Sequence, residues 1–266
     1  MSVVLQISDP HFGTEQLPVV EALVELSLRH RPDVVVLSGD ITQRARPEQF
    51  RAAKAFVDRL NTNTLIIPGN HDIPLFNLSE RLLRPYARFC AVFGDELEPV
   101  FSSRDLLLQC LNTTRRYRHT NGEVSAEQIA RVSSRLLSAQ PDQLRIVVVH
   151  QPVAVRHVED EHDRLRGFAA AVESWGDAGC DLVMGGHIHL PYVMELPGPN
   201  RRMWAVQAGT AVSSRVRDGA PNSVNLLRWG DGISSKGRCY IEQWDFDEVG
   251  KVFFRKKVTQ VRPARA

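Results

Sequence analysis

Cysteines and long apolar runs are scarce in this 266-residue chain, and neither sign of charge is in excess. The four cysteines form no Cys-x-x-Cys pair, so we expect reduced, buried side chains and no disulfide framework. No apolar run approaches the roughly 20 residues that a bilayer span requires. The first residues also lack the pattern of a secretory signal. We therefore expect a cytoplasmic protein that neither crosses nor binds a membrane.

The charge balance excludes a strongly basic or acidic binding surface. The chain has 33 Lys and Arg against 31 Asp and Glu, for a net charge of +2 and a pI near 8.4. This balance is too mild to predict a nucleic-acid partner. A charged fraction of 24% and a hydrophobic fraction of 43% are typical of a globular protein. The length suits a single domain, which we expect to span residues 1–266.

The first third of the chain alternates short β-branched runs with segments of helical period. Residues 17–30 and 47–60 each place their apolar side chains on one stripe, and Pro47 stands at a favoured first-turn position. Apolar runs at 3–7, 34–37 and 65–67 flank these helices. This alternation predicts a largely parallel sheet covered by helices.

The middle of the chain is less regular. We expect one helix around residues 78–93, inside a proline-containing segment, 74–101, that could leave the core and overhang the site. Further helices are expected at 125–137, where Ser125 and Gln128 can form a capping box, and at 165–178.

The last third changes character after Gly186. Five short apolar runs follow, separated by turn residues and without long helices: 192–196, 203–208, 223–229, 239–246 and 251–258. This pattern predicts a second, mainly antiparallel arrangement of strands. Together with the first third, it predicts an α/β fold of two packed sheets with outer helices.

Histidines and acidic residues recur at the points where apolar runs end. Five of the nine histidines lie in such pieces, most of them flanked by glycine. The pieces are Asp9-Pro10-His11, Gly39-Asp40, Gly69-Asn70-His71-Asp72, His150 and Gly186-His187-Ile188-His189. Repetition at five predicted strand ends indicates a shared site rather than five unrelated polar residues.

The residue types in these pieces suit a pair of divalent cations. Carboxylate, imidazole and amide oxygen ligands favour manganese, iron or zinc. Asp40 could bridge two ions, with Asp9 and His11 serving one ion and Asn70 the other. Two ions held in this way make hydroxide available near neutral pH and neutralise the oxygens of a phosphate under in-line attack.

The histidines divide between coordination and proton transfer. His187 and His189 share one face of an extended segment, so the two side chains could reach neighbouring ions. His71 is a candidate to protonate the departing alkoxide. Asp72 could orient His71 or cap the segment that follows.

These motifs, in this order over residues 9–189, resemble the motif set of the calcineurin-like metallophosphoesterases. The resemblance implies a four-layer α/β/β/α sandwich of two mixed sheets flanked by helices. It implies that His71 acts as the acid or stabilises the transition state. It also implies one ion held by Asp9, His11, Asp40 and His189, and a second held by Asp40, Asn70, His150 and His187.

Two departures narrow the resemblance within the superfamily. The residues after Asp40 read Ile41-Thr42-Gln43-Arg44, unlike the Gly-Asp-x-Val-Asp-Arg-Gly block of the protein serine/threonine phosphatases. His71 stands where the lipid A pathway pyrophosphatases carry arginine. The chain looks most similar to bacterial class III cyclic-nucleotide phosphodiesterases and their broad-specificity relatives.

The resemblance therefore implies an enzyme: a phosphodiesterase for small-molecule phosphoesters, with 3′,5′-cyclic nucleotides as candidate substrates. A nucleotide pyrophosphatase or a phosphomonoesterase of the same superfamily remains an alternative. Another is a protein-binding module that has lost catalysis, as the retromer subunit of this superfamily has. The sequence encodes neither the natural substrate nor the metals used in the cell nor the oligomeric state.

Three polar stretches stay outside the predicted site. Arginine suits phosphoesters, and Arg215, Arg217 and the 115–119 cluster follow predicted strands. We nevertheless favour solvated positions for both groups of arginines, as is usual for this residue. The acidic loop 157–163 is interpreted as a solvated turn rather than a third metal site.

Overall fold

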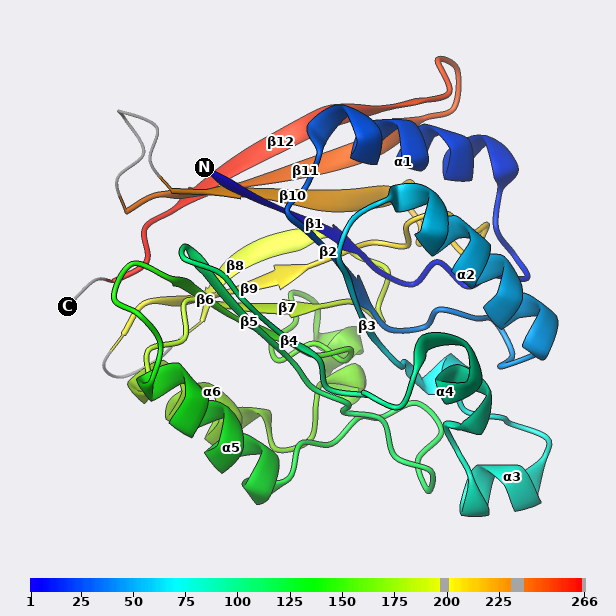
Figure 1. The fold of residues 1–266 in the computed structure, drawn as a ribbon, viewed down its shortest axis with the longest axis horizontal. Helices are drawn as coiled ribbons and strands as arrows, with labels where there is room; N and C mark the ends of the chain where they lie inside the picture. The colour runs from blue at the N-terminus through cyan, green and yellow to red at the C-terminus, as the bar shows by residue number, and fades with distance from the viewer. Residues whose placement is uncertain (197–200, 231–236, 265–266) are drawn as a thin grey trace.

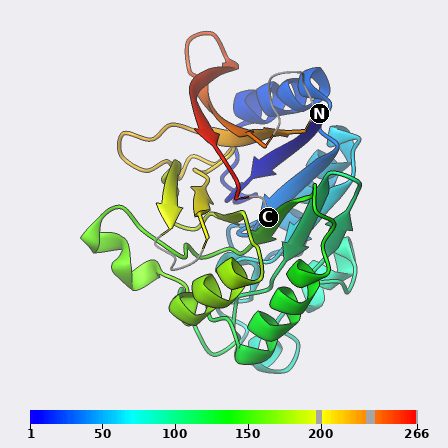
Figure 2. The same ribbon diagram turned by 90° about the vertical axis from the view of Figure 1, so that its left-hand side faces the viewer.

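The computed structural model describes residues 1–196, 201–230 and 237–264, which fold into four layers (Figure 1). Two six-stranded sheets pack face to face. Helices α1 (Leu17–His30) and α2 (Pro47–Leu60) cover the outer face of the first sheet. Helices α5 (Ala126–Leu137) and α6 (Phe168–Asp177) cover the second, and Figure 2 shows the same stack from the side. The predicted α/β/β/α sandwich of two mixed sheets is confirmed.

The first sheet is half parallel and half antiparallel. Its order is β12 (Val252–Val261), β11 (Cys239–Asp247), β10 (Ser223–Trp229), β1 (Ser2–Ile7), β2 (Val34–Ser38) and β3 (Thr64–Ile67). Strands β1 to β3 run parallel, whereas β10 to β12 pair antiparallel. The helices between the parallel strands supply the crossovers that such pairing requires.

The second sheet has a parallel centre between two antiparallel edges. Its order is β4 (Val100–Ser102), β5 (Leu106–Cys110), β6 (Leu144–Val148), β7 (Leu182–Gly185), β9 (Met203–Gln207) and β8 (Tyr192–Leu196). Strands β4 and β8 are the antiparallel edges. Between them, β9 joins β7 in parallel.

The strands after Gly186 do not form an arrangement of their own, so that part of the prediction is wrong. Strands β8 and β9 complete the second sheet, while β10 to β12 extend the first. The alternation of apolar and polar residues identifies a strand but not the strand with which it pairs. The sequence alone therefore could not assign these five strands to two different sheets. The chain crosses from one sheet to the other between β9 and β10.

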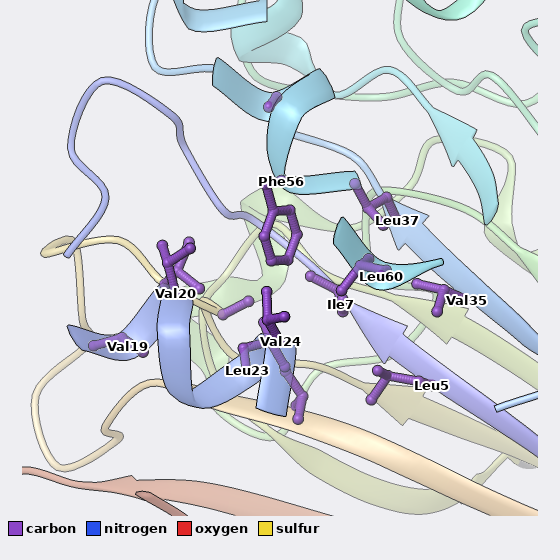
Figure 3. Packing of buried hydrophobic residues seen from close by; sticks show 14 of the residues in the cluster. Leu5, Ile7, Val19, Val20, Leu23, Val24, Val35, Leu37, Phe56 and Leu60 are labelled. Carbon is purple, nitrogen blue, oxygen red and sulfur yellow. The ribbon is translucent and has the colours of Figure 1, made fainter. Parts of the chain in front are cut away.

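Three buried apolar clusters correspond to the three interfaces between layers. The two faces of a strand serve different interfaces, as its period of two requires. In β2, Val35 and Leu37 face the helices, whereas Val34 and Val36 face the other sheet. Figure 3 shows part of the outer cluster, where strand residues meet helix residues: Leu5, Ile7, Val35, Leu37, Leu23, Val24, Phe56 and Leu60.

The predicted helix over 78–93 is two helices. Helix α3 (Leu78–Leu83) and α4 (Ala87–Phe93) are separated at Pro85, which lacks an N–H and disfavours helical geometry in the residue before it. The side chain of Phe89 is fully buried in the cluster beneath α2, so α4 belongs to the core. Helix α3 lies at the rim of the molecule, where Leu78, Leu82 and Leu83 are exposed (Figure 1).

Several helix boundaries follow the sequence closely. Ser125 caps α5 with the predicted capping box.

The acidic segment 157–163, expected to be a loop, instead contains the 3-10 helix η2 (Val158–Asp163). A second short 3-10 helix, η1 (Asn70–Asp72), follows β3. Among the described residues, no helix combines the length and the apolar character needed to cross a bilayer.

Candidate metal centre

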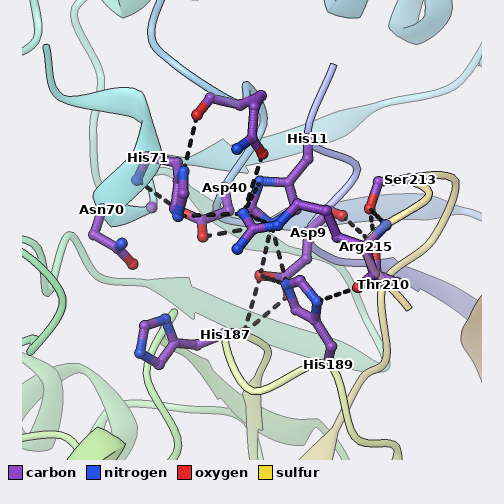
Figure 4. A network of polar contacts seen from close by, with 12 residues as sticks. Asp9, His11, Asp40, Asn70, His71, His187, His189, Thr210, Ser213 and Arg215 are labelled. Carbon is purple, nitrogen blue, oxygen red and sulfur yellow. Dashed lines mark hydrogen bonds and ion pairs between the residues drawn. The ribbon is translucent and has the colours of Figure 1, made fainter. Parts of the chain in front are cut away.

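All predicted site residues meet at the seam between the two sheets. Asp9 and His11 follow β1, Asp40 follows β2, and Asn70 and His71 lie in η1 just after β3. The second sheet supplies His150 after β6, and His187 and His189 after β7. The carboxyl ends of these parallel strands face the same end of the sandwich, so both sheets contribute to one site (Figure 4).

The donor atoms of the predicted ligands fall into two groups. In the first, His11 Nε2 lies 3.0 Å from His189 Nε2, which is 3.4 Å from Asp9 Oδ1. The second unites Asp40, His150 and His187, and Asn70 Oδ1 lies 3.3 Å from His150 Nε2.

Asp40 is common to both groups. Its Oδ2 lies 3.7 Å from His11 Nε2 in the first group, and its Oδ1 lies 3.3 Å from His150 Nε2 in the second. A cation bound at about 2.1 Å from each ligand needs donors with roughly such spacings. The residues present therefore fit two divalent cations that share one carboxylate, and the donor types suit manganese, iron or zinc.

The backbone of the site is strained. Five of the residues have positive φ angles: Asp9 (50°), His11 (44°), Asp40 (50°), His187 (74°) and His189 (54°). Side chains other than glycine rarely adopt this left-handed region, and such residues concentrate at functional sites. In two of the loops these residues alternate along the chain, at Asp9 and His11 and at His187 and His189.

Two of the flanking glycines are explained by close approach. A Cβ atom on Gly39 would lie 2.3 Å from His150 Nδ1, and one on Gly69 would lie 2.1 Å from the backbone nitrogen of Asp40. Gly39 also has a φ of +100°. Any side chain at either position would push the loops of the site apart.

Burial and neighbouring charges shift the pKa values of the site residues in different directions. Burial lowers the pKa of His11 to about 3, so its ring is neutral and can donate a lone pair. Burial alone would raise the pKa values of Asp9 and Asp40, but the surrounding histidines hold both below their usual range. His150 is the counterpart: burial would lower its pKa, yet Asp40 and Asp9 raise it to about 9.

Backbone carbonyls orient three of the histidine rings. The Nδ1 atoms of His150, His189 and His71 contact the carbonyls of Ser38 (2.8 Å), Arg215 (2.7 Å) and Gln43 (2.9 Å), respectively. A ring that donates Nδ1–H to a carbonyl presents Nε2 as its free nitrogen. In all three histidines, Nε2 is the atom that faces the site.

Asp72 meets neither expectation: its carboxylate caps η1, the short helix that it belongs to, rather than the segment that follows, and no contact with the His71 ring is seen among the described residues. Its carboxylate accepts hydrogen bonds from the backbone N–H groups of Gly69, Ile41 and Thr42, and from the Thr42 hydroxyl. Burial and the nearby Asp40 raise the pKa of Asp72 to about 7, against the effect of these donors. Asp72 thus ties η1 to the loop that carries Asp40.

Arg215 lies in the site, contrary to the favoured solvated position. Its Nη1 is 3.3 Å from His71 Nε2, 3.3 Å from His11 Nδ1 and 3.1 Å from Gln43 Oε1 (Figure 4). With its described neighbours, Arg215 forms no ion pair. Nothing in the sequence separates it from Arg217, whose Nη1 instead lies 2.9 Å from Asp160 Oδ1.

The arginines of the 115–119 cluster are engaged elsewhere. Arg115 binds the Asn112 carbonyl and Gln128, Arg116 binds the Leu82 carbonyl, and Arg118 pairs with Glu123. Of this cluster, His119 is the member that lines a small recess next to Asn70 and His71.

The acidic segment 157–163 is not simply a solvated turn, so this expectation is also wrong. Asp160 is buried in its ion pair with Arg217, and Asp163 Oδ1 lies 3.4 Å from His187 Nε2. His162 is exposed, as expected. A run of acids gives no sign of which member faces inward, and this contact depends on tertiary structure.

Known proteins resemble this chain in sequence. Residues 2–191 match the calcineurin-like phosphoesterase family. A probable glycerophosphodiester phosphodiesterase from Arcobacter nitrofigilis is 23% identical over 207 residues, 70% of this chain and 71% of that protein. A cAMP/cGMP dual specificity phosphodiesterase from Mycobacterium tuberculosis is 25% identical over 209 residues, 70% of this chain and 61% of that protein.

Two further proteins are similar to this chain, one in sequence and one in structure. A glycerophosphodiester phosphodiesterase from Enterobacter lignolyticus is 38% identical over 77 residues, 25% of this chain and 28% of that protein. The match therefore spans less than two thirds of the Enterobacter and mycobacterial relatives. A solved dimetal phosphatase from Danio rerio superposes with a TM-score of 0.69 at 13% identity, covering 99% of both chains, which shows the shared fold.

Proposed function

The chain belongs to the calcineurin-like phosphoesterase family of metal-dependent phosphoester hydrolases, and we propose that it is a dinuclear phosphodiesterase for small molecules. The observation that carries this proposal is the arrangement of two donor groups around the two oxygens of Asp40. A site that bound a single ion would have no need of a carboxylate placed between two sets of histidines.

We assign the ligands of the two ions from these groups. Asp9, His11, Asp40 and His189 would hold the first ion; Asp40, Asn70, His150 and His187 would hold the second. Two ions bound there would supply a water of lowered pKa and would neutralise the charge of the phosphate oxygens. Their identity is proposed as manganese, iron or zinc from the donor types.

His71 is proposed to deliver the proton that the leaving group needs. The Gln43 carbonyl accepts from Nδ1, so Nε2 points toward the site. In the imidazolium form both ring nitrogens carry a proton, and Nε2–H would pass its proton to the departing oxygen, leaving a neutral ring. The His71 ring packs edge-on against His11, with centroids 4.9 Å apart, and so lies close to the first group.

Arg215 is proposed to bind the phosphate. Guanidinium groups hold phosphate oxygens through paired, charge-assisted hydrogen bonds. The Arg215 side chain lies between His11 and His71, where an anion would meet both this cation and the proton donor. Because it pairs with none of its described neighbours' carboxylates, a phosphate would not have to displace an ion pair.

Phosphodiesters are the proposed substrates because the similar proteins are named for them. Cyclic nucleotides and glycerophosphodiesters are therefore the first compounds to test, and cytoplasmic location stays part of the proposal. Pyrophosphatase and monoesterase activities are the alternatives. A protein-binding module without catalysis would be expected to lack ligand residues, and every predicted ligand is present at the seam.

The test is turnover by the purified, manganese-loaded protein. Bis(p-nitrophenyl) phosphate, 3′,5′-cyclic AMP, a glycerophosphodiester, a nucleoside diphosphate conjugate and p-nitrophenyl phosphate should be compared at equal concentration. We expect the diesters to be cleaved fastest. Faster cleavage of the diphosphate conjugate or the monoester would replace the diesterase assignment, and no cleavage of any compound would refute the enzyme.

A further inference from the structure

His187 is held differently from three of the other site histidines. Backbone carbonyls orient His150, His189 and His71 through Nδ1. His187 instead directs Nε2 toward a side-chain carboxylate, Asp163 Oδ1, at 3.4 Å. The His187 side chain is 8% exposed and that of Asp163 is 20% exposed, so water screens the contact only in part. If Nε2 carries the proton, Nδ1 is the nitrogen left to coordinate an ion.

The segment that carries Asp163 is anchored on both sides of the contact. Asp160 Oδ1 lies 2.9 Å from Arg217 Nη1, which also donates to the Ile188 carbonyl at 3.3 Å. Arg217 therefore links η2 directly to the turn that contains His187. On the other side, the Leu165 N–H donates to the Pro152 carbonyl at 2.9 Å.

We propose that Asp163 is a positioning residue that accepts the Nε2–H of His187 and thereby fixes the ring to bind the second ion through Nδ1. Partners of this kind hold the tautomer and orientation of a metal-binding histidine and raise its basicity. The proposal rests on the proposed dinuclear site but concerns a residue outside its ligand set. It makes one of the two ions depend on a side chain from η2.

The experiment measures metal binding and needs no substrate. Metal-free protein is titrated with Mn²⁺ by calorimetry, and low-temperature electron paramagnetic resonance distinguishes coupled pairs from single ions. Asp163→Asn keeps the shape of the side chain and removes its charge. Glu161→Gln is the matched control, because Glu161 lies in the same short helix and pairs only with Arg164 among its described neighbours.

We expect Asp163→Asn to weaken one of the two ions by about 10- to 100-fold, as is typical of such partners, and to leave the other unchanged. Its spectrum should show single ions at Mn²⁺ concentrations that give coupled pairs in the wild type and in Glu161→Gln. Arg217→Gln, which frees η2 without touching His187, should shift the same ion by a smaller factor. It serves as the test if Asp163→Asn does not fold.

Equal affinities for both ions in Asp163→Asn and Glu161→Gln would overturn the positioning role and leave the dinuclear site standing. Equal weakening of both ions would also overturn it, because the contact involves the second group alone. A wild-type protein that binds fewer than two ions would instead refute the proposed function on which this inference rests.

Discussion

The two donor groups share Asp40 but are supported by different kinds of contact. In the first, the Arg215 carbonyl holds His189, and the rings of His11 and His71 pack against each other. In the second, the Ser38 carbonyl holds His150, whereas His187 depends on the side chain of Asp163. The second group also reaches Asn70, which is only half-buried. We therefore expect that, if two ions bind as proposed, the second would exchange more readily than the first.

Removing the shared carboxylate should weaken metal binding in both donor groups at once. Asp40→Asn replaces one of the two carboxylate oxygens with an NH₂ group, which does not bind cations, and removes the negative charge, so one carbonyl oxygen remains for two ions. We expect the loss of at least one ion and a fall of turnover to background. Metal analysis after dialysis, with a diester assay, checks this against the exposed-surface control Asp58→Asn. Normal activity with two ions in Asp40→Asn would rule out the bridging role.

The His71→Ala variant separates proton transfer from coordination. His11, Asp40 and His71 also lie close enough to bind a metal together, so a role in coordination is a real alternative. We expect both ions to remain and turnover to fall by about 10²- to 10⁴-fold, the usual effect of losing a general acid. Loss of an ion from this variant would move His71 into the ligand set.

Arg215 and Arg217 can be compared directly, because Arg215 contacts His11 and His71 whereas Arg217 contacts Asp160 and the Ile188 carbonyl. Losing a hydrogen bond between charged groups costs about 1.5–3 kcal/mol, so Arg215→Ala should lower kcat/KM by about 10- to 100-fold. Inhibition by inorganic phosphate should weaken in parallel. At saturating Mn²⁺, Arg217→Ala should keep the phosphate inhibition constant of the wild type. The same shift in both variants would contradict a specific phosphate contact.

Acidity should act on the second group through His150. Because the carboxylates raise the pKa of His150 to about 9, the ring is protonated below that pH and an entering cation must displace the proton. Below about pH 9, the affinity of the second ion should therefore fall by up to about tenfold per pH unit. Calorimetry in buffers of different ionisation enthalpy measures the released protons. A pH-independent affinity would argue against His150 as a ligand.

Local signals predicted much of this architecture. The helices at 17–30 and 47–60 begin and end where amphipathic period and proline placed them, and Ser125 caps α5 as expected. The site residues were identifiable because each motif is short and contiguous and because parallel strands gather their carboxyl ends. Their roles as ligands stay predictions.

Tertiary contacts account for what could not be predicted. Arg215 and Arg217 are two residues apart and point to different partners, which only the path of the chain between β9 and β10 decides. Asp163 meets His187 from a segment with no motif. The division of the late strands between two sheets depends on pairing partners that the alternation of a single strand does not encode.

The position of the site at the seam has a consequence for folding. Each proposed ion would draw ligands from both sheets, so it would act as a cross-link between the two halves of the molecule. The segment between β9 and β10 strengthens this seam, because Thr210 and Ala211 donate hydrogen bonds to the carbonyls of Asp9 and Ser8. An ion present at a hundred times its Kd stabilises the folded state by about 2.7 kcal/mol. Chelation would thus loosen the closure of the sandwich itself.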